Sequence, residues 1–282
     1  MTALDWDEVE YLVEMALDED VGRGDLTTAV AVPPETRGAF TMRARHPIIV
    51  AGVDIAAHVF ETLSPDCDVE IHLADGAAAE TGVAIAHITG PAPGLLTAER
   101  TALNFIQFLS GIATCARDFV RETEGTKAVM VDTRKTLPGY RSLSKYASSL
   151  GGLRNHRMRL DDGVLIKDNH ISIAGSVTAA VEGAKRGTPL LTKIEVECDT
   201  LDQVTEAINA GADMLLLDNM SLDSLREAVR ITAGRIPLEA SGGVTIHTVK
   251  GIAQTGVDFI SSGRITQSPP AADIGLDVSL ET

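Results

Sequence analysis

Residues 132–170 concentrate side chains that bind small anions. This segment reads DTRKTLPGYRSLSKYASSLGGLRNHRMRLDDGVLIKDNH and holds eight Lys or Arg residues against four Asp residues, a formal charge of +4. The whole chain carries a formal charge of −16. Arginine binds carboxylate and phosphate groups as a bidentate fork, and lysine binds them as a point charge. The segment therefore predicts a site for a small anionic ligand.

Polar residues also follow several apolar runs that are typical of short strands. In an α/β barrel the functional groups collect where the parallel strands end. Carboxylates there can hold a divalent cation, and Ser/Gly loops after late strands present backbone N–H groups to phosphate. We therefore expect a phosphorylated sugar, an anionic second substrate and Mg²⁺ to bind at this face. The polar or glycine residues at the predicted strand ends are Asp132, Thr133, Arg134, Lys135, Lys167, Asp168, Asn169, His170, Glu195, Glu197, Asp218, Asn219, Glu239, Ser241, Gly242, Gly243, Ser261, Ser262 and Gly263.

The elements that must position these residues follow from the hydrophobic pattern. Helical patterns at 201–211 and 222–234 lie between the apolar runs, and the last strands recur about every 20–24 residues, the length of one βα unit. This rhythm predicts parallel strands in an α/β barrel or a doubly wound sheet. No GxGxxG follows the first strand, so a Rossmann dinucleotide site is not supported. The predicted strands span 128–133, 163–168, 191–197, 213–219, 237–242 and 258–263.

The preceding part of the chain predicts a smaller α+β domain. Short alternating segments favour strands at 37–45, 46–53, 67–73 and 82–90, and apolar periodicity favours helices at 6–19 and 54–63. We expect a glycine-rich turn at 20–28 and a long helix over 96–125, with a candidate break at Ser110-Gly111. The alternating tail after Pro269-Pro270 predicts a last strand. The predicted domains are an N-terminal α+β domain, 1–111 with the return of 270–282, and a catalytic α/β barrel, 112–269.

Composition excludes several classes of protein. A charge of −16 repels nucleic acid and anionic membranes. Cys67, Cys115 and Cys198 are odd in number and lack CxxC spacing, which disfavours a disulfide framework or a zinc site and favours a reducing compartment. The acidic N-terminal segment does not have the pattern of a signal peptide, and no apolar run is long enough to span a membrane. We expect a cytoplasmic protein.

Several longer strings carry a resemblance to a known family. The strings are EDVGRGDLTT, ERTALNFIQFLSGIAT, DTRKTLPGYRSLSKYA, GGLRNHRMRLDDGVLIKDNHI, EVEC, LLLDNM and LEASGGV. In order and spacing they resemble the quinolinate phosphoribosyltransferases (nicotinate-nucleotide pyrophosphorylases, carboxylating), which are type II phosphoribosyltransferases. The resemblance covers nearly the whole chain, and DTRKT-PG and NHR…LIKDNHI are its most specific parts.

The resemblance implies a fold and a reaction. The fold would be an open, irregular α/β barrel preceded by a smaller α+β domain, in a homodimer whose partner chain completes each site. The reaction would convert quinolinate and phosphoribosyl pyrophosphate, with Mg²⁺, into nicotinate mononucleotide, pyrophosphate and CO₂ for NAD biosynthesis.

The resemblance also implies roles for individual residues. Arg134, His156, Arg157 and Lys167 would form the quinolinate pocket, with Thr133 and Lys135 beside them. Glu197 and Asp218 would face the ribose hydroxyls and hold the metal through the substrate; no single residue is assigned as acid or base. Arg100 would reach across from the neighbouring subunit. The 5′-phosphate would be bound by Ser241, Gly242, Gly243, Ser262, Gly263 and Arg264.

Physical chemistry agrees with most of these roles. Carboxylates such as Glu197 and Asp218 can stabilise the oxocarbenium-like state through which pyrophosphate leaves ribose. A lone histidine such as His156 is more often structural than a ligand. The chain departs from the family pattern at Leu153-Arg154 and in the last loop, where Arg264 and Gln267 alter the predicted phosphate site.

Three alternatives remain open from the sequence. A phosphoribosyltransferase for another heterocyclic acid would share nearly all of these residues. A barrel lyase would use Lys167 as a Schiff-base nucleophile, which borohydride would trap with its substrate. A nucleotide-binding regulator without catalysis would not need to keep Glu197 and Asp218.

Overall fold

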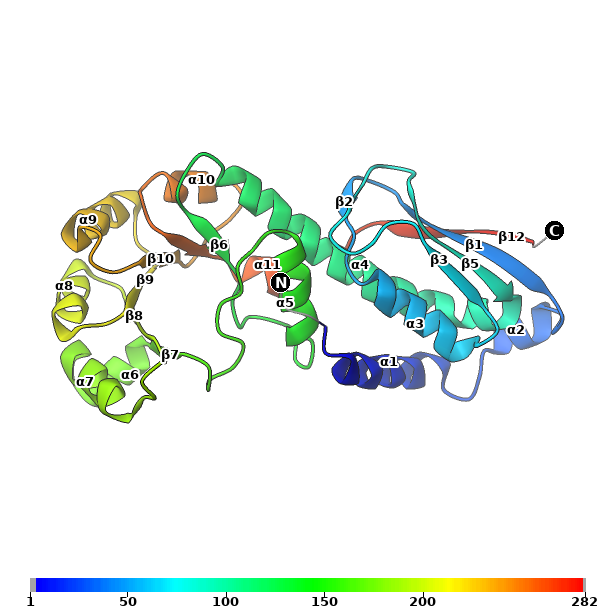
Figure 1. The fold of residues 1–282 in the computed structure, drawn as a ribbon, viewed down its shortest axis with the longest axis horizontal. Coiled ribbons are helices and arrows are strands. Elements are labelled where there is room, and N and C mark those ends of the chain that lie inside the picture. The colour runs from blue at the N-terminus through cyan, green and yellow to red at the C-terminus, as the bar shows by residue number, and fades with distance from the viewer. Residues whose placement is uncertain (1–3, 281–282) are drawn as a thin grey trace. The chain divides into compact units, whose positions relative to one another are not determined.

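The computed structural model describes residues 4–280, which divide into two compact units (Figure 1). One unit holds the described residues up to Arg117, Ser142–Gly151 and the residues from Ser268 onward. The other holds Asp118–Arg141 and Gly152–Gln267. Residues 1–3 and 281–282, which the sequence assigns to the N-terminal domain, lie outside the described residues.

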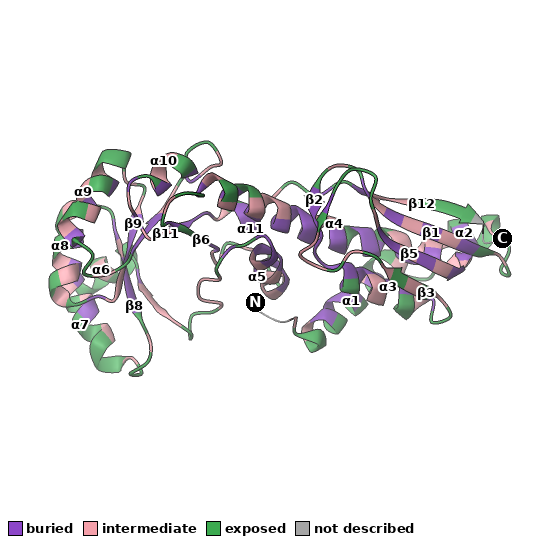
Figure 2. Cartoon of the chain, turned by 45° about the horizontal axis from the view of Figure 1, so that its top comes forward, coloured by how far each residue is buried: buried purple, intermediate pink, exposed green. Residues whose placement is uncertain are grey.

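The first unit is built on a four-stranded antiparallel sheet in the order β12-β1-β5-β3. Residues of β1 alternate between buried and partly exposed, which places Phe40, Met42 and Ala44 on the covered face. Buried residues run along the sheet and the helices packed on it (Figure 2). Its elements are α1 (Trp6–Val21), α2 (Leu26–Ala31), β1 (Arg37–Ala44), β2 (Ile48–Ile49), α3 (Val53–Leu63), β3 (Asp68–Ile71), β4 (Ala78–Ala79), β5 (Ala84–Pro91), the first part of α4 (Ala92–Glu122), nearly all of α5 (Arg141–Leu150) and β12 (Ile274–Leu280).

The long helix α4 has no break at Ser110-Gly111, so the candidate break is wrong. Gly111 instead allows the chain at Pro270 to approach the helix closely. A Cβ at Gly111 would lie 2.3 Å from the carbonyl oxygen of Pro270. The segment that leads into β12 therefore packs directly on the helix backbone. Gln107 supports the same contact, since its Nε2 donates to the Ile274 carbonyl at 2.7 Å.

The second unit contains a six-stranded parallel sheet in the order β6-β11-β10-β9-β8-β7, with helices on its outer face (Figure 1). A single bridge between Val131 and Arg154 extends the edge at β6. The predicted α/β architecture, an open barrel with a smaller α+β part before it, is confirmed. The elements are β6 (Val129–Val131), β7 (Val164–Ile166), α6 (Asp168–Ala174), α7 (Val177–Gly187), β8 (Ile194–Cys198), α8 (Leu201–Ala210), β9 (Met214–Asp218), α9 (Leu222–Thr232), β10 (Leu238–Ser241), α10 (Val249–Ala253), β11 (Phe259–Ser261) and α11 (Arg264–Gln267).

Two local predictions in the first unit are wrong. The predicted strand at 46–53 is reduced to β2, which pairs only with β4, because Val53 already begins α3. The predicted turn at 20–28 contains the start of α2. Asp25 caps this short helix, since its side chain accepts hydrogen bonds from the backbone N–H and the hydroxyl of Thr28.

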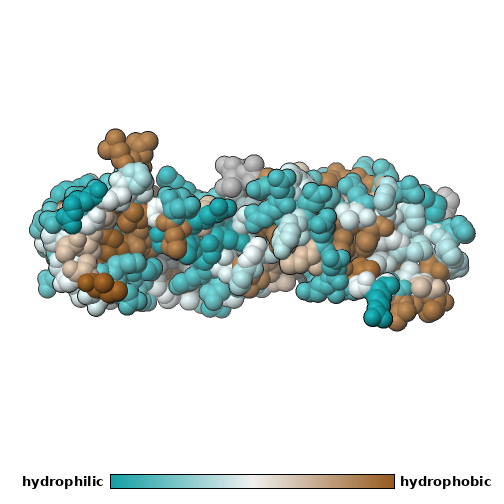
Figure 3. Space-filling view, turned by 90° about the horizontal axis from the view of Figure 1, so that it is seen from below, coloured by the Kyte–Doolittle hydropathy of each residue, from teal (hydrophilic) through white to brown (hydrophobic). Residues whose placement is uncertain are grey.

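No helix of residues 4–280 is long and apolar enough to cross a membrane. On the face drawn in Figure 3, apolar side chains form separate patches in a largely hydrophilic surface. Leu26 and Val30 on α2 are more than four-fifths exposed, and so are Ile173, Leu190 and Leu191 in the second unit.

Candidate active site

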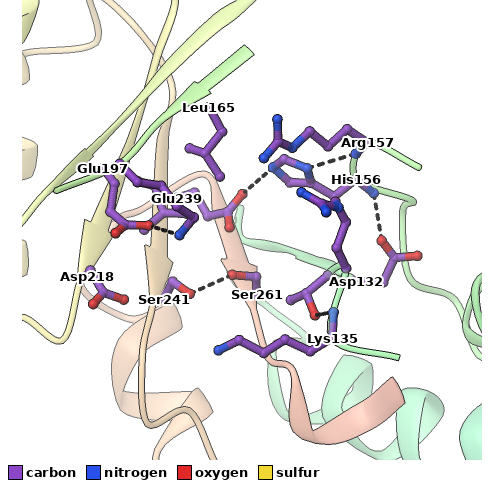
Figure 4. A pocket seen from close by; sticks show the side chains of 14 residues that line it. Asp132, Lys135, His156, Arg157, Leu165, Glu197, Asp218, Glu239, Ser241 and Ser261 are labelled. Atoms are coloured by element: carbon purple, nitrogen blue, oxygen red, sulfur yellow. Dashed lines mark hydrogen bonds and ion pairs between the residues drawn. The ribbon is translucent and has the colours of Figure 1, made fainter. Parts of the chain in front are cut away.

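A cavity of about 310 Å³ lies at the carboxyl ends of the parallel strands in the second unit (Figure 4). Cations, carboxylates and serine hydroxyls converge on it from all six strands or the loops that follow them. Two leucines supply the apolar part of the wall. The lining residues are Asp132, Thr133, Arg134, Lys135, His156, Arg157, Leu165, Lys167, Glu197, Leu216, Asp218, Glu239, Ser241 and Ser261.

Successive side chains of β8 lie on opposite faces of the sheet, which explains how carboxylates come to line the inside of the barrel. Ile194, Val196 and Cys198 are buried, and burial raises the pKa of the Cys198 thiol to about 12. Glu195 and Glu197, on the opposite face of the same strand, line cavities inside the barrel. A strand with apolar residues on its outer face therefore carries two acids on its inner face.

Two arginines on one wall of the cavity repel each other. Burial lowers the pKa of Arg157, and the positive charge of Arg134 lowers it further. Arg157 donates from Nη1 to the carbonyl of Gly163 at 2.7 Å. The Nε of Arg134 is buried and has no hydrogen-bond partner among the described residues. A buried donor without a partner is costly, so this wall is prepared for an anion that would satisfy Arg134 and offset the repulsion.

Carboxylates occupy the other wall. Lys167, the residue after β7, forms an ion pair with Glu197 on β8, and the carboxylate is only 11 % exposed. Asp218 ends β9, and its Oδ2 accepts a hydrogen bond from Nδ2 of Asn219 at 2.6 Å. The two acids thus stand at the ends of neighbouring strands. They place negative charge opposite the arginine wall.

The Ser/Gly loops after β10 and β11 are joined to each other. The Ser261 hydroxyl donates to the Ser241 hydroxyl at 3.0 Å, and the Ser262 hydroxyl donates to the Val244 carbonyl at 3.0 Å. Gly242 has a φ of 87°, and a Cβ there would lie 2.3 Å from Oδ1 of Asn219, so the turn requires glycine. The loops form one connected edge of the site.

A cluster of one histidine and two buried acids lies at the cavity, and two of its members, His156 and Glu239, line it. One ligand atom from each of His156, Glu195 and Glu239 lies within 4.8 Å of the other two. Burial, followed by the nearby charge of Glu195, raises the pKa of Glu239 to about 8. The Nε2 of His156 lies 3.0 Å from Oε2 of Glu195, as expected for an N–H donor. Hydrogen bonding within the protein thus already uses this nitrogen.

The raised pKa of Glu239 predicts a stability effect. The folded state holds this proton more tightly than the unfolded state, so the stabilisation is complete below pH 4.5 and is lost as the pH rises to about 8. Glu239→Gln cannot ionise. Between about pH 5 and about pH 8.5 we expect the unfolding free energy of the unaltered protein to fall by ~2–4 kcal/mol more than that of the variant.

Urea unfolding at both pH values measures this difference. Glu182→Gln, at an exposed carboxylate on α7, is the matched control and should follow the unaltered protein. An equal loss of stability in Glu239→Gln and the unaltered protein would contradict a protonated Glu239.

The structure brings nine of the fifteen predicted site residues into the cavity wall. Gly242, Gly243, Ser262 and Gly263 lie in the adjoining loops and Arg264 begins α11, and none of the five lines the cavity. Gly263 packs on Lys135, since a Cβ there would lie 2.5 Å from Cδ of that lysine. The nine are Thr133, Arg134, Lys135, His156, Arg157, Lys167, Glu197, Asp218 and Ser241.

Arg100 lies on α4 in the first unit, where it lines a separate cavity of about 390 Å³ with Asp20, Asp25 and Leu26.

The cations of the basic segment 132–170 lie in different surroundings. Four of its eight cations line the active-site cavity, whereas Lys145 is fully buried in α5 and Arg154 lies over the ring of Phe259. Charge density in the sequence alone does not separate these groups.

Five lining residues had no role assigned from the sequence: Asp132, Leu165, Leu216, Glu239 and Ser261. Three of them, Asp132, Glu239 and Ser261, stand at predicted strand ends, so their position was a usable signal. The two leucines share the inward face with the acids of neighbouring strands. From the sequence, only the alternation of inward and outward side chains along each strand could have indicated that these two leucines line the cavity.

Comparison with known proteins gives a consistent result. A sequence model described as quinolinate phosphoribosyl transferase, C-terminal domain, matches residues 112–277, and the corresponding N-terminal domain matches residues 25–110. A protein of Synechocystis named "Probable nicotinate-nucleotide pyrophosphorylase [carboxylating]" is 42% identical over 280 residues, 98% of this chain and 93% of that protein.

Two further relatives cover nearly the full length. A nicotinate-nucleotide pyrophosphorylase [carboxylating] of Mycobacterium leprae is 40% identical over 97% of this chain and 98% of its own. The solved structure of the nicotinate-nucleotide pyrophosphorylase of Francisella tularensis superposes with a TM-score of 0.94 at 39% identity, covering 98% of each chain.

Proposed function

The chain belongs to the quinolinate phosphoribosyltransferase family, and on this premise we propose that it transfers phosphoribose from phosphoribosyl pyrophosphate to quinolinate. The products are nicotinate mononucleotide, pyrophosphate and CO₂, which makes the enzyme a pentosyltransferase of NAD biosynthesis. The observation that carries this function is the arginine wall, where Arg134 has a buried, unpartnered Nε and Arg157 is repelled by it.

Quinolinate suits that wall because it carries two adjacent carboxylates. In our proposal Arg134, Arg157 and Lys167 bind these carboxylates, with Thr133 and Lys135 beside them. Binding both groups would orient the ring nitrogen toward the anomeric carbon of ribose, and such orientation supplies much of a two-substrate rate enhancement. A fixed pair of guanidinium groups also favours two carboxylates over one.

The carboxylate wall suits the phosphoribosyl donor. As the ring nitrogen bonds to the anomeric carbon, the bond to pyrophosphate breaks and positive charge develops on ribose. Glu197 and Asp218 would stabilise that charge and bind the ribose hydroxyls. Their hard oxygen ligands at neighbouring strand ends also fit Mg²⁺ held largely through the substrate, and a bound Mg²⁺ would offset charge on the leaving pyrophosphate.

Decarboxylation follows from the chemistry of the ribosylated ring. The ring nitrogen is then cationic, and its charge stabilises the electron pair that stays on the adjacent ring carbon when the bond to the 2-carboxylate breaks. CO₂ leaves, and a proton replaces it on the ring carbon. Leu165 and Leu216 line the same cavity, and exclusion of water from the carboxylate would favour its loss. We assign no single acid or base.

The decisive assay measures CO₂ and nicotinate mononucleotide from quinolinate, phosphoribosyl pyrophosphate and Mg²⁺, with nicotinate as a parallel substrate. We expect one CO₂ for each nucleotide from quinolinate and no comparable turnover of nicotinate. Turnover of another heterocyclic acid in preference to quinolinate would overturn the substrate assignment. The Lys167–Glu197 ion pair disfavours the Schiff-base alternative, because an ammonium group has no lone pair with which to attack a carbonyl.

The last loop predicts a selective effect on the sugar phosphate. Ser241, Gly242, Gly243, Ser262, Gly263 and Arg264 would bind the 5′-phosphate. Arg264→Ala should raise KM for phosphoribosyl pyrophosphate roughly tenfold, the value of one charged hydrogen bond, and change KM for quinolinate less than twofold. Arg226→Ala, at an exposed ion pair on α9, is the control for steady-state kinetics. Equal weakening of both substrates would count against this assignment.

We propose further that the enzyme is a homodimer in which Arg100 of the partner subunit completes each site. Leu26, which lines the cavity of Arg100, and Val30 are more than four-fifths exposed on α2 and offer an apolar surface for a second chain. We also propose a cytoplasmic location, since its reducing conditions suit the free thiols of Cys67 and Cys198.

Mixing two inactive variants tests the shared site. Arg100→Ala and Lys167→Ala chains, unfolded and refolded together in equal amounts, should regain about a quarter of the unaltered activity, because half of the dimers hold one intact site of two. Each variant refolded alone is the control. Failure of the mixture to exceed the controls, with dimers present by light scattering, would contradict a site shared in this way.

A further inference from the structure

Both ring nitrogens of His156 are engaged within the protein. The backbone N–H of Arg157 donates to Nδ1 at 2.8 Å, and Nε2 lies 3.0 Å from Oε2 of Glu195 (Figure 4 shows the Arg157 contact). Glu239 lies on the same side of the ring, with its Oε2 3.5 Å from Nε2. The ring thus lies between the main chain of the next residue and two acids of the barrel interior.

These contacts define the protonation of the ring. A nitrogen that accepts an N–H must offer a lone pair, so Nδ1 carries no hydrogen. The single ring hydrogen is then on Nε2, where it is donated to Glu195. An imidazolium would place a hydrogen on Nδ1 against the amide hydrogen of Arg157. The geometry therefore describes a neutral imidazole in one tautomer.

Buried acids and hydrogen bonds to the main chain hold the ring and backbone of His156 in this arrangement. Glu195 on β8 is 5 % exposed and Glu239 on β10 is 1 % exposed. Beyond the end of β6, Asp132 accepts the backbone N–H of His156 at 2.8 Å and Nδ2 of Asn155 at 2.7 Å. The side chain and the main chain of His156 are thus fixed from three strands of the barrel, directly before Arg157.

We propose that His156 is a positioning residue: a neutral imidazole, oriented by Glu195, that fixes the main chain of Arg157 and so holds its guanidinium in the quinolinate pocket. The inference deepens the proposed function and rests on it. Quinolinate is then bound by the permanent charges of Arg134, Arg157 and Lys167. His156 supplies no charge to the substrate.

The ring itself gives the first test. Nitrogen-15 NMR of protein labelled at histidine, with His156→Gln to assign the signals, distinguishes protonated from unprotonated ring nitrogens. We expect one of each at neutral pH in the free protein and no second protonation when quinolinate is added to saturation. An imidazolium, in either the free or the quinolinate-bound protein, would overturn the proposal.

Matched variants give the second test. Glu195→Gln keeps a carbonyl oxygen that can accept the Nε2 hydrogen, so KM for quinolinate should rise less than about threefold, whereas Glu195→Ala should raise it by roughly 10–100-fold. If the ring were cationic, the glutamine variant would lose an ion pair and be impaired like the alanine variant. His156→Gln and His156→Asn, which retain one neutral hydrogen bond, should each be less impaired than His156→Ala.

The pH dependence of KM for quinolinate also distinguishes a neutral, positioning His156 from a cationic His156 that binds the substrate. The titratable and charged groups around the ring are Glu195 from β8, Glu239 from β10, Asp132 after β6 and the guanidinium groups of Arg134 and Arg157 in the same cavity. KM for quinolinate should be flat between about pH 5.5 and about pH 7.5, the range in which an exposed histidine titrates. A tenfold rise across that range would overturn the proposal. Absence of turnover by the unaltered enzyme would refute the proposed function instead, and the NMR signals would still decide the state of the ring.

Discussion

Lys167→Ala should lower kcat/KM for quinolinate by roughly 10²–10³-fold, because two effects add. The substrate loses a cation, and Glu197, only 11 % exposed, loses the ion-pair partner that compensates its charge. Removing one member of a fully buried charge pair costs about 3–5 kcal/mol. Lys167 is 46 % exposed, so the loss of this pair costs less than that, and the lost contact with the substrate supplies the rest of the effect. Lys167→Arg should restore part of the loss, since the charge is kept in a different geometry.

The measurement is steady-state kinetics with each substrate varied in turn. Lys127→Ala is a suitable control, because Lys127 also forms an ion pair, with Asp258 at 2.7 Å, but is 58 % exposed and does not line the cavity. It should leave kcat/KM within about twofold. A loss in Lys167→Ala no greater than in this control would exclude Lys167 from the substrate site.

Asp218→Asn should lower kcat by roughly 10²–10³-fold while KM for quinolinate stays nearly constant. The carboxylate at the end of β9 would act on the positive charge that appears on ribose only in the transition state, and such groups act mainly on kcat. The asparagine side chain keeps the volume and can still contact Asn219, which isolates the effect of the charge.

Asp213→Asn provides the matched control at the opposite end of β9. Its carboxylate accepts the backbone N–H of Ile194 at 2.8 Å, a bond that an asparagine carbonyl can also accept. Single-turnover experiments should locate the defect of Asp218→Asn in the chemical step. An increase in KM with unchanged kcat would show that Asp218 acts in ground-state binding alone.

The sequence predicted the second unit better than the first. Buried parallel strands are apolar on their outward face and polar at their carboxyl end, so β8, β9 and β10 were visible as runs that finish in acid or Ser/Gly residues. In the first unit the apolar run 46–53 was ambiguous, because it contains both β2 and the start of α3. Short apolar runs do not distinguish a strand from the first turn of a helix.

The candidate site was predictable in composition but not in detail. Arg134, Lys167 and Glu197 stood out because they lie at the ends of apolar runs that the sequence predicts to be strands. The surroundings of the His156 Nε2 could not be foreseen, because they depend on Glu195 and Glu239 meeting from non-adjacent strands. Sequence spacing indicates which residues share a strand face, but not the distances across a barrel.

The antiparallel pairing of β1 with β12 joins Gly38 to Leu280, so the sheet of the first unit is complete only after residue 280 has left the ribosome. Until then β1 has β5 on one side and an unpaired edge on the other. Native contacts of such high sequence separation slow folding, and open strand edges recruit other chains. The nascent protein therefore passes through a stage, lasting about ten seconds or more at elongation rates of about 5–20 residues per second, in which it needs protection from aggregation.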